Sequence, residues 1–272
     1  MKKRIVILAV TVLVMAGSVA AQFGQRRGGR FGAFLRRPAA DTFDGRFNFC
    51  RIGFNNGYRD GGGWSVDYPR ADVNLSIRLS ELTKAPVSFN DSGEPKHIVI
   101  GLTEDALFRC PFIMMTEVGG VYFDDAEAAR LRAYLLKGGF LWADDFWGPH
   151  AWDNWENEIR KALPASEFPI VDVPIDHPLF RTLFEIARVP QIPSINFWGG
   201  RGGPTSERGA SSAEVHTRAV YDQRGRMMVF MTHNTDFGDS FEREGDDPNY
   251  FYEFSVHGYA VGIDILLYAL TH

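Results

Sequence analysis

The sequence predicts an α/β fold, a three-layer sandwich with a mostly parallel central sheet. Short apolar segments alternate with amphipathic ones through the middle of the chain, and capping residues and glycines mark where the amphipathic segments begin and end. Short buried strands separated by such helices are typical of a parallel sheet covered by helices on both faces. The part of the chain after residue 40 is long enough for one domain with a full core.

The first residues have the three parts of an export signal. Lys2, Lys3 and Arg4 form a basic start, residues 5–15 are almost wholly apolar, and residues 18–21 are small. This pattern predicts a cleavable signal peptide at 1–21 and a periplasmic or secreted protein. The apolar run is short for a membrane span, so we expect no transmembrane domain after cleavage, and retention as an uncleaved anchor is the alternative.

Residues 22–40 are rich in glycine and arginine and show no periodic pattern, which predicts a flexible linker. Residues 1–40 contain eight basic and no acidic residues, so residues 41–272 carry 21 basic against 34 acidic residues, a net charge of −13. We expect a single α/β domain at 41–272. An acidic exported domain argues against nucleic acid as the partner.

The domain opens with a predicted strand and a glycine-rich loop. Phe47 and Phe49 alternate with polar or small neighbours, which indicates a strand within residues 43–54. The segment 57–64 contains four glycines and is expected to be a loop.

A helix is predicted next. Asp67 and Pro69 stand where a helix cap and a first turn would be, and Leu75 and Leu79 follow at helical spacing. We expect the helix to end near Thr83 and Asp67 to do structural work at its start.

The middle of the chain alternates strand and helix signals. Asp124 and Glu127 are spaced as a helix cap and its partner, and Gly138 and Gly139 end that helix. The expected elements are a strand at 97–101, a short helix at 104–109, a strand at 112–116, the capped helix, a strand at 140–143, a helix around 152–159 and a strand at 170–173.

The last third contains an insertion, a hairpin and a final helix. Residues 199–214 have little apolar content and are expected to be mobile. Segments 218–222 and 226–232 flank a glycine-containing turn, which indicates a β-hairpin. Charged residues interrupt the apolar helix predicted at 250–269, so it should pack on the sheet rather than enter a membrane.

The two cysteines leave two possibilities open. Cys50 lies in a predicted strand and Cys110 at the end of a predicted short helix. An oxidising compartment would allow a bridge, while burial as two free thiols is the interpretation that we favour from the sequence.

Several motifs resemble a known family. Trp64, the run DYPRADVNLSIRLSELT at 67–83, the run GGFLWADD at 138–145 and the final GYAVGIDILLYALTH resemble the bacterial family called domain of unknown function 4159. The stretch from a strand through Asp124 and Lys137 into GGFL at 138–141, with the later DHPLF at 176–180, resembles the class I glutamine-amidotransferase-like, flavodoxin-like fold. The resemblance implies that fold and no established activity.

An amidotransferase of this fold needs a cysteine on the tight turn between a strand and a helix. The matching segment reads WADDF at 142–146 and has no thiol. The resemblance therefore implies a non-catalytic ligand- or partner-binding domain. Possible partners are an envelope protein, a glycan or a peptide.

Polar residues at the ends of two predicted strands support an alternative, catalytic function. Open α/β sheets bind ligands at the carboxyl ends of their strands, and His and carboxylate side chains serve there as metal ligands or as acids and bases. The same residue types also cap helices and fix turns, and no zinc-type spacing is present, so we expect no metal and no other cofactor. The catalytic candidates for an exported, metal-assisted hydrolase are Asp144, Asp145, His150 and His233, and the metal candidates are Asp144, Asp145, His233 and Asp236.

Aromatic residues gather around the same predicted strand ends. They are typical of core packing, and they can also stack on sugar rings or peptide side chains. The ligand-binding candidates are Trp64, Asp67, Tyr68, Asp145, Phe146, Trp147, Asn234 and Asp236.

Overall fold

The computed structural model describes residues 42–58 and 60–272. All of them lie in one compact unit. The predicted signal peptide at 1–21 and the linker at 22–40 lie outside the described residues, and both stay predictions.

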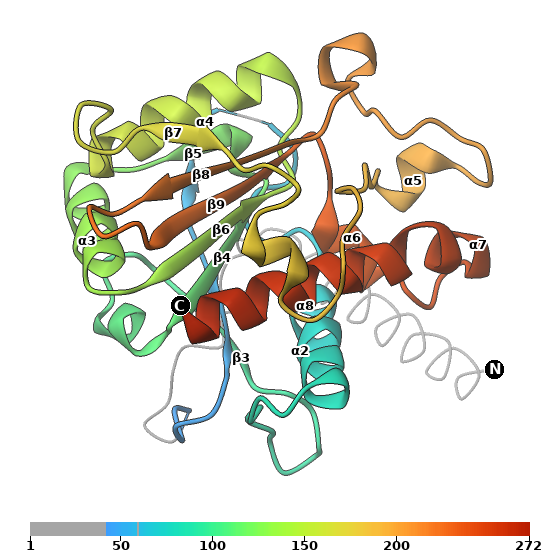
Figure 1. The fold of residues 1–272 in the computed structure, drawn as a ribbon, viewed down its shortest axis with the longest axis horizontal. Helices are drawn as coiled ribbons and strands as arrows, with labels where there is room; N and C mark the ends of the chain where they lie inside the picture. The colour runs from blue at the N-terminus through green and yellow to red at the C-terminus, as the bar shows by residue number, and fades with distance from the viewer. Residues whose placement is uncertain (1–41, 59) are drawn as a thin grey trace, which may run out of the picture. The chain divides into compact units, whose positions relative to one another are not determined.

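A seven-stranded sheet forms the centre of the domain, with the strand order β3-β1-β4-β6-β9-β8-β7 (Figure 1). Strand β8 runs antiparallel to both of its neighbours, and every other pairing in this sheet is parallel. A small antiparallel pair, β2-β5, stands apart. The strands are β1 Phe49–Ile52, β2 Asn55–Asn56, β3 His97–Ile100, β4 Phe112–Thr116, β5 Val121–Tyr122, β6 Phe140–Asp144, β7 Ile170–Asp172, β8 His216–Tyr221 and β9 Met227–His233.

Helices cover both faces of the sheet (Figure 1). Helices α2, α6 and α8 pack against one another on one side, and α3 packs against α4 on the other. The predicted α/β architecture with a mostly parallel sheet is confirmed at this level. The helices are α2 Arg70–Leu82, α3 Asp125–Leu136, α4 Gly148–Ala162, α5 Ile195–Trp198, α6 Phe237–Glu242, α7 Pro248–Tyr250 and α8 Val256–Thr271, with short 3₁₀ turns at Asp105–Arg109, Val118–Gly120, Pro178–Arg181 and Gly209–Ser212.

The alternation of side chains along β6 explains why both faces are covered. Phe140 and Trp142 belong to the core that also contains residues of α2, α6 and α8. Leu141 and Ala143 point to the opposite face and are fully buried as well. A strand that buries both sets of alternate side chains needs a helix layer on each side.

The local signals in the middle of the chain are confirmed. The Asp124 carboxylate accepts from the Glu127 backbone N–H at 2.8 Å, and the Glu127 carboxylate accepts from the Asp124 N–H at 3.0 Å. This reciprocal pair starts α3, as the sequence predicts. The strand at 112–116 and the hairpin of β8 and β9 also form as expected.

Two expectations for the start of the domain were wrong in detail. The first strand covers only Phe49–Ile52, because Phe47 forms an isolated bridge to Val87 instead of continuing it. Asp67 does not cap α2, since the N-cap residue is Pro69 and no side chain caps it. Asp67 is therefore available for another role.

The C-terminal helix is a core element. The segment Pro248–Thr271, which joins α7, a π-helical turn at Phe251–Ser255 and α8, is long and apolar enough to cross a membrane by length and composition. However, 61% of its most apolar window is buried inside the fold. Helix α8 contacts β4, α2 and α6, which confirms that it packs on the sheet.

Cys50 and Cys110 form a disulfide, with their Cα atoms 6.2 Å apart. The favoured expectation of two free thiols was wrong. Cys50 lies on β1 and Cys110 lies just before β4, and these two strands are neighbours in the sheet. The strand order therefore brings together two residues that are 60 positions apart.

Candidate functional site

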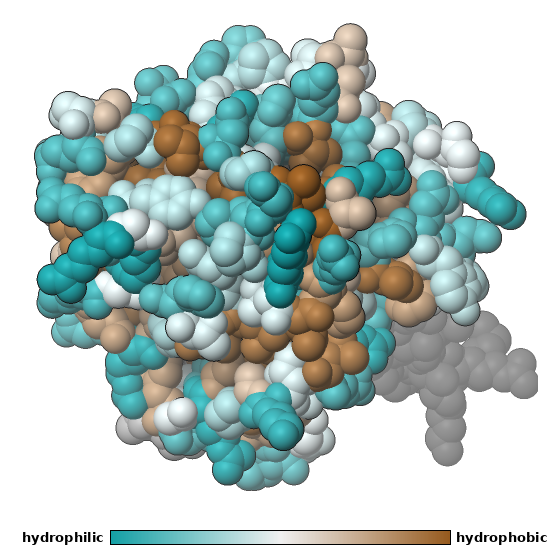
Figure 2. Space-filling view, viewed as in Figure 1, coloured by the Kyte–Doolittle hydropathy of each residue, from teal (hydrophilic) through white to brown (hydrophobic). Residues whose placement is uncertain are grey.

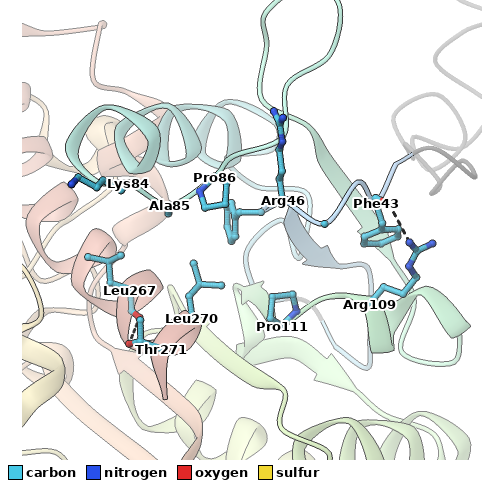
Figure 3. Close-up of a pocket in the computed structure, with 12 residues that line it drawn as sticks. Phe43, Arg46, Lys84, Ala85, Pro86, Arg109, Pro111, Leu267, Leu270 and Thr271 are labelled. Carbon is cyan, nitrogen blue, oxygen red and sulfur yellow. Dashed lines mark hydrogen bonds between the residues drawn. The ribbon is translucent and has the colours of Figure 1, made fainter.

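One hollow in the described part of the chain has no carboxylate or histidine in its lining. It has a volume of about 670 Å³ and is lined mainly by apolar side chains, with Pro111 before β4 and Leu267 and Leu270 near the end of α8 (Figure 3). Figure 3 also shows Arg109 donating to the backbone oxygen of Phe43, so this guanidinium is held by the wall.

Another hollow, about 330 Å³ in volume, lies at the carboxyl ends of the parallel strands, and we call it the acidic pocket. Glu117 directly follows β4, Asp145 directly follows β6, and Asp236 follows β9 by three residues. Parallel strands end at a common edge, which is where open α/β sheets bind ligands. The charged residues among its described lining are Asp67, Glu117, Asp145, Glu207, Asp236, Asp239, Glu242 and Arg243.

Three buried carboxylates form the centre of the acidic pocket. Asp67, Asp145 and Asp236 each offer an oxygen, and these atoms all lie within 4.8 Å of one another. The residues are 4%, 6% and 3% exposed. Burial is the largest cause that raises the pKa of each of them well above its ordinary value, and repulsion from neighbouring carboxylates raises it further.

The backbone holds several of these residues in an uncommon conformation. Asp67, Glu117 and Asp145 have φ values of 62°, 49° and 56°. They are three of the four non-glycine residues with positive φ among residues 42–58 and 60–272, the fourth being Asn234. Non-glycine residues rarely adopt this region, and such conformations gather at functional sites.

Glu117 is held by the glycine-rich loop. Its carboxylate accepts a hydrogen bond from the Gly63 backbone N–H. A side chain at Gly61 would approach the Glu117 carboxyl group to 2.4 Å, and Gly61 has a φ of 70°, so the loop needs glycine there. Burial raises the pKa of Glu117 to about 7, against the opposing effect of the hydrogen bonds from Gly63 and Gly62.

Asp67 carries an unsatisfied oxygen. Within residues 42–58 and 60–272, the buried Oδ2 atom has no hydrogen-bond partner. A Cβ atom at Gly238 would lie 2.2 Å from this oxygen, so the glycine lets the start of α6 approach Asp67 closely. Arg51, which lies nearby, is already paired with Asp72 by hydrogen bonds from Nε and Nη2, and both side chains are fully buried.

Asp144, the first catalytic candidate, is not among the described lining of the acidic pocket and has a structural role beside it. Its carboxylate accepts from the Thr232 hydroxyl and from the backbone N–H groups of Phe237 and Gly238, the latter two at 2.9 and 3.3 Å. Burial raises its pKa to about 7. Asp144 therefore ties the end of β6 to the start of α6.

The histidine candidates are also placed away from the carboxylate group. His233 Nε2 donates to the Gly148 backbone oxygen, 3.0 Å away, and its ring stacks on Phe146 with centroids 4.8 Å apart. His150 is exposed at the start of α4. Among the described residues, neither of the two groups with metal-ligand spacing contains a histidine.

The ligand-binding candidates separate into two sets. Asp67, Tyr68, Asp145 and Asp236 line the acidic pocket. The other four, Trp64, Phe146, Trp147 and Asn234, are buried and are absent from the described lining.

Two of these buried residues have structural contacts. Trp147 Nε1 donates to Asp145 Oδ1 at 2.9 Å and fixes that carboxylate. Asn234 accepts from the Gly148 N–H and donates to the Glu214 oxygen, which joins two loops. Of the two, Trp147 therefore positions a residue of the pocket wall.

The sequence reasoning missed several charged residues of the pocket. Glu117 stands directly after a predicted strand, so the strand-end rule that selected Asp145 could have found it. Glu207 and Glu242 lie in a loop and in α6, and no local pattern marks them. Arg243 contacts Asp239, 3.4 Å away, and Glu242, 2.8 Å away.

Comparison with known families gives one match. The family model described as Domain of unknown function (DUF4159) matches residues 49–270. No curated protein matches the chain.

Proposed function

The chain belongs to this family of unknown function, and from its acidic pocket we propose that it is a cation-dependent binding protein. In this proposal, a hard divalent cation binds between Asp67, Asp145 and Asp236 and presents open coordination positions to an oxygen-rich ligand. The proposal departs from the sequence-based expectation of no metal.

One observation carries the proposal. Three buried carboxylates have oxygens within 4.8 Å of one another, in a pocket whose described lining has seven acidic residues and one basic residue. Buried charges need partners, and either shared protons or a cation can neutralise such a group. The unpartnered Oδ2 of Asp67 supports the cation, because a buried carboxylate oxygen that accepts no hydrogen bond is free to coordinate one.

The ligand set indicates the class of cation. All three groups are carboxylates, and oxygen-only sets suit Mg²⁺, Ca²⁺ and Mn²⁺ better than zinc or copper. A site with three protein ligands leaves coordination positions for water or for a ligand.

The finer expectations from the sequence belong to this proposal. Export by the signal at 1–21 would place the domain where glycans, peptides and other envelope proteins are available as ligands. The Cys50–Cys110 disulfide supports export, because such bonds persist in oxidising compartments. The likeness to the amidotransferase-like fold is supported by Asp145, which stands on the turn from β6 to α4.

Thermal unfolding with and without cations tests the proposal. After treatment with EDTA, we expect Ca²⁺, Mg²⁺ or Mn²⁺ to raise the Tm, since a ligand that binds only the folded state stabilises it. The variant Asp236→Asn should lose this rise while it keeps the helix cap, because asparagine caps helices as well as aspartate does.

Asp91→Asn is the matched control. Asp91 is exposed in a turn and is not among the described lining of the acidic pocket, and asparagine is equally suited to a turn. The control should keep the full response to the cation. Absence of a Tm rise with all three cations would contradict the proposal.

The second candidate is a metal-assisted hydrolase. The position and φ of Asp145 favour it, because a strained residue on a strand-to-helix turn is typical of catalytic positions. Of the four catalytic candidates, Asp145 is the one that lines the pocket. Turnover of a chromogenic ester, phosphate or glycoside in the presence of Mn²⁺, lost in Asp145→Asn, would favour this function over binding alone.

A further inference from the structure

A second group with metal-ligand spacing shares a residue with the first. Asp67, Asp239 and Glu242 each offer an oxygen, and these atoms lie within 4.8 Å of one another. Asp67 is thus common to both groups. From this shared residue we infer that the acidic pocket binds two divalent cations bridged by Asp67, an inference that rests on the proposed function.

The charge of the pocket supports a second cation. Among its described lining, seven acidic residues face one basic residue. At full ionisation, one divalent cation would leave most of that negative charge uncompensated. The second group is also less buried than the first, since Glu242 is only half-buried, so the second cation has access from solvent.

The contacts of the second group leave coordination sites open. Asp239 Oδ2 accepts from the Tyr250 hydroxyl at 3.3 Å and from the Ile195 backbone N–H, and Arg243 contacts the other oxygen at 3.4 Å. A carboxylate oxygen can accept further bonds beyond these. Arg243 also pairs with Glu242, so it competes with the second cation.

The bridging residue has the required free oxygen. Asp67 is 4% exposed, lines the pocket, and its Oδ2 has no hydrogen-bond partner among the described residues. Paired cations in proteins typically lie about 3.5–4 Å apart on shared ligands, and this spacing suits two groups that share one carboxylate. The structure therefore assigns Asp67 to both cations.

Metal counting on the full chain tests the inference. After EDTA treatment and equilibration with Mn²⁺, isothermal titration and elemental analysis should give two ions per chain. Electron paramagnetic resonance should show the spin coupling of a Mn²⁺ pair. Glu242→Gln should reduce the count to one and abolish the coupling, and Asp67→Asn should reduce the count to zero.

The outcomes separate the two proposals. One uncoupled ion per chain in the unaltered protein would overturn the second site and leave the proposed function intact. No bound ion would overturn both. Glu253→Gln is the matched control, because Glu253 is exposed on the C-terminal helix, and it should keep two ions. Two ions retained in Glu242→Gln would overturn the assignment of the second site.

Discussion

The substitution Asp145→Asn should change stability in opposite directions with and without a cation. In the metal-free protein it removes one of three negative charges that are buried together. With a cation bound, it removes a ligand. Asparagine suits the position, because it tolerates the left-handed backbone and keeps an oxygen that can accept from Trp147 Nε1.

The size of the effect follows from the spacing of the oxygens. Two unit charges 4.8 Å apart repel by about 3.5 kcal/mol at an effective dielectric constant of about 20. Asp145 faces both Asp67 and Asp236, and these oxygens are at most 4.8 Å apart, so full ionisation of all three would give a repulsion on Asp145 of at least about 7 kcal/mol. Their raised pKa values mean that protons relieve part of this repulsion at pH 8. We therefore expect a gain in unfolding free energy of about 3 kcal/mol, or about 6–12 °C in Tm for a domain of this size.

Two thermal denaturation series check this prediction. In EDTA at pH 8, the Asp145→Asn protein should melt above the unaltered protein. With Ca²⁺ or Mn²⁺ at about 100 times the dissociation constant, the unaltered protein should gain about 2.7 kcal/mol and the variant much less. The difference between the two proteins should then shrink or change sign.

Either of two results would refute the reasoning. Equal Tm values in EDTA would mean that the carboxylates of Asp145, Asp67 and Asp236 do not repel one another. An equal gain from the cation in both proteins would mean that Asp145 is not a ligand. Asp91→Asn should follow the unaltered protein in both series.

Three further predictions concern the fold. Arg51→Met leaves Asp72 buried without its partner and should lower the free energy of unfolding by about 3–5 kcal/mol in urea titrations, while combining it with Asp72→Leu should recover most of that loss. Reduction of the Cys50–Cys110 disulfide opens a loop of 60 residues and should lower the free energy of unfolding by about 4 kcal/mol. A thiol assay on the protein unfolded without reductant should find no free thiol. Burial lowers the pKa of His233 from 6.5 to about 4. As the pH falls, the unfolded chain therefore binds a proton at this histidine before the folded chain does. The free energy of unfolding should fall by about 3 kcal/mol for this reason between about pH 6.5 and about pH 4. Comparison with His233→Gln over that pH range isolates this contribution, and equal pH slopes for the two proteins would contradict it.

Local patterns of the sequence predicted most elements of the fold. The capping pair Asp124 and Glu127, the apolar strand at 112–116 and the hairpin near the C-terminus all depend on neighbouring residues. Interactions within a few residues are encoded in order along the chain, so they can be read without the fold.

The role of Asp67 could not be predicted in this way. A residue before Pro69 at a helix start looks like a cap, yet Asp67 has a positive φ and its carboxylate lies beside those of Asp145 and Asp236. These three residues come from separate parts of the chain, and their proximity depends on how α2, β6 and α6 are packed. Asp145 and Asp236 were predicted from their places after strands and both line the acidic pocket, while their role in binding stays a prediction.

The sequence by itself determined that the chain folds as an α/β domain, which residues end its strands, and that the domain is strongly acidic. Only the tertiary structure decided that Cys50 pairs with Cys110, and that the acidic residues gather in one pocket. The physical reason is that strand order fixes which strand ends are neighbours. That order is set by long-range packing of the whole core, and no local pattern encodes it.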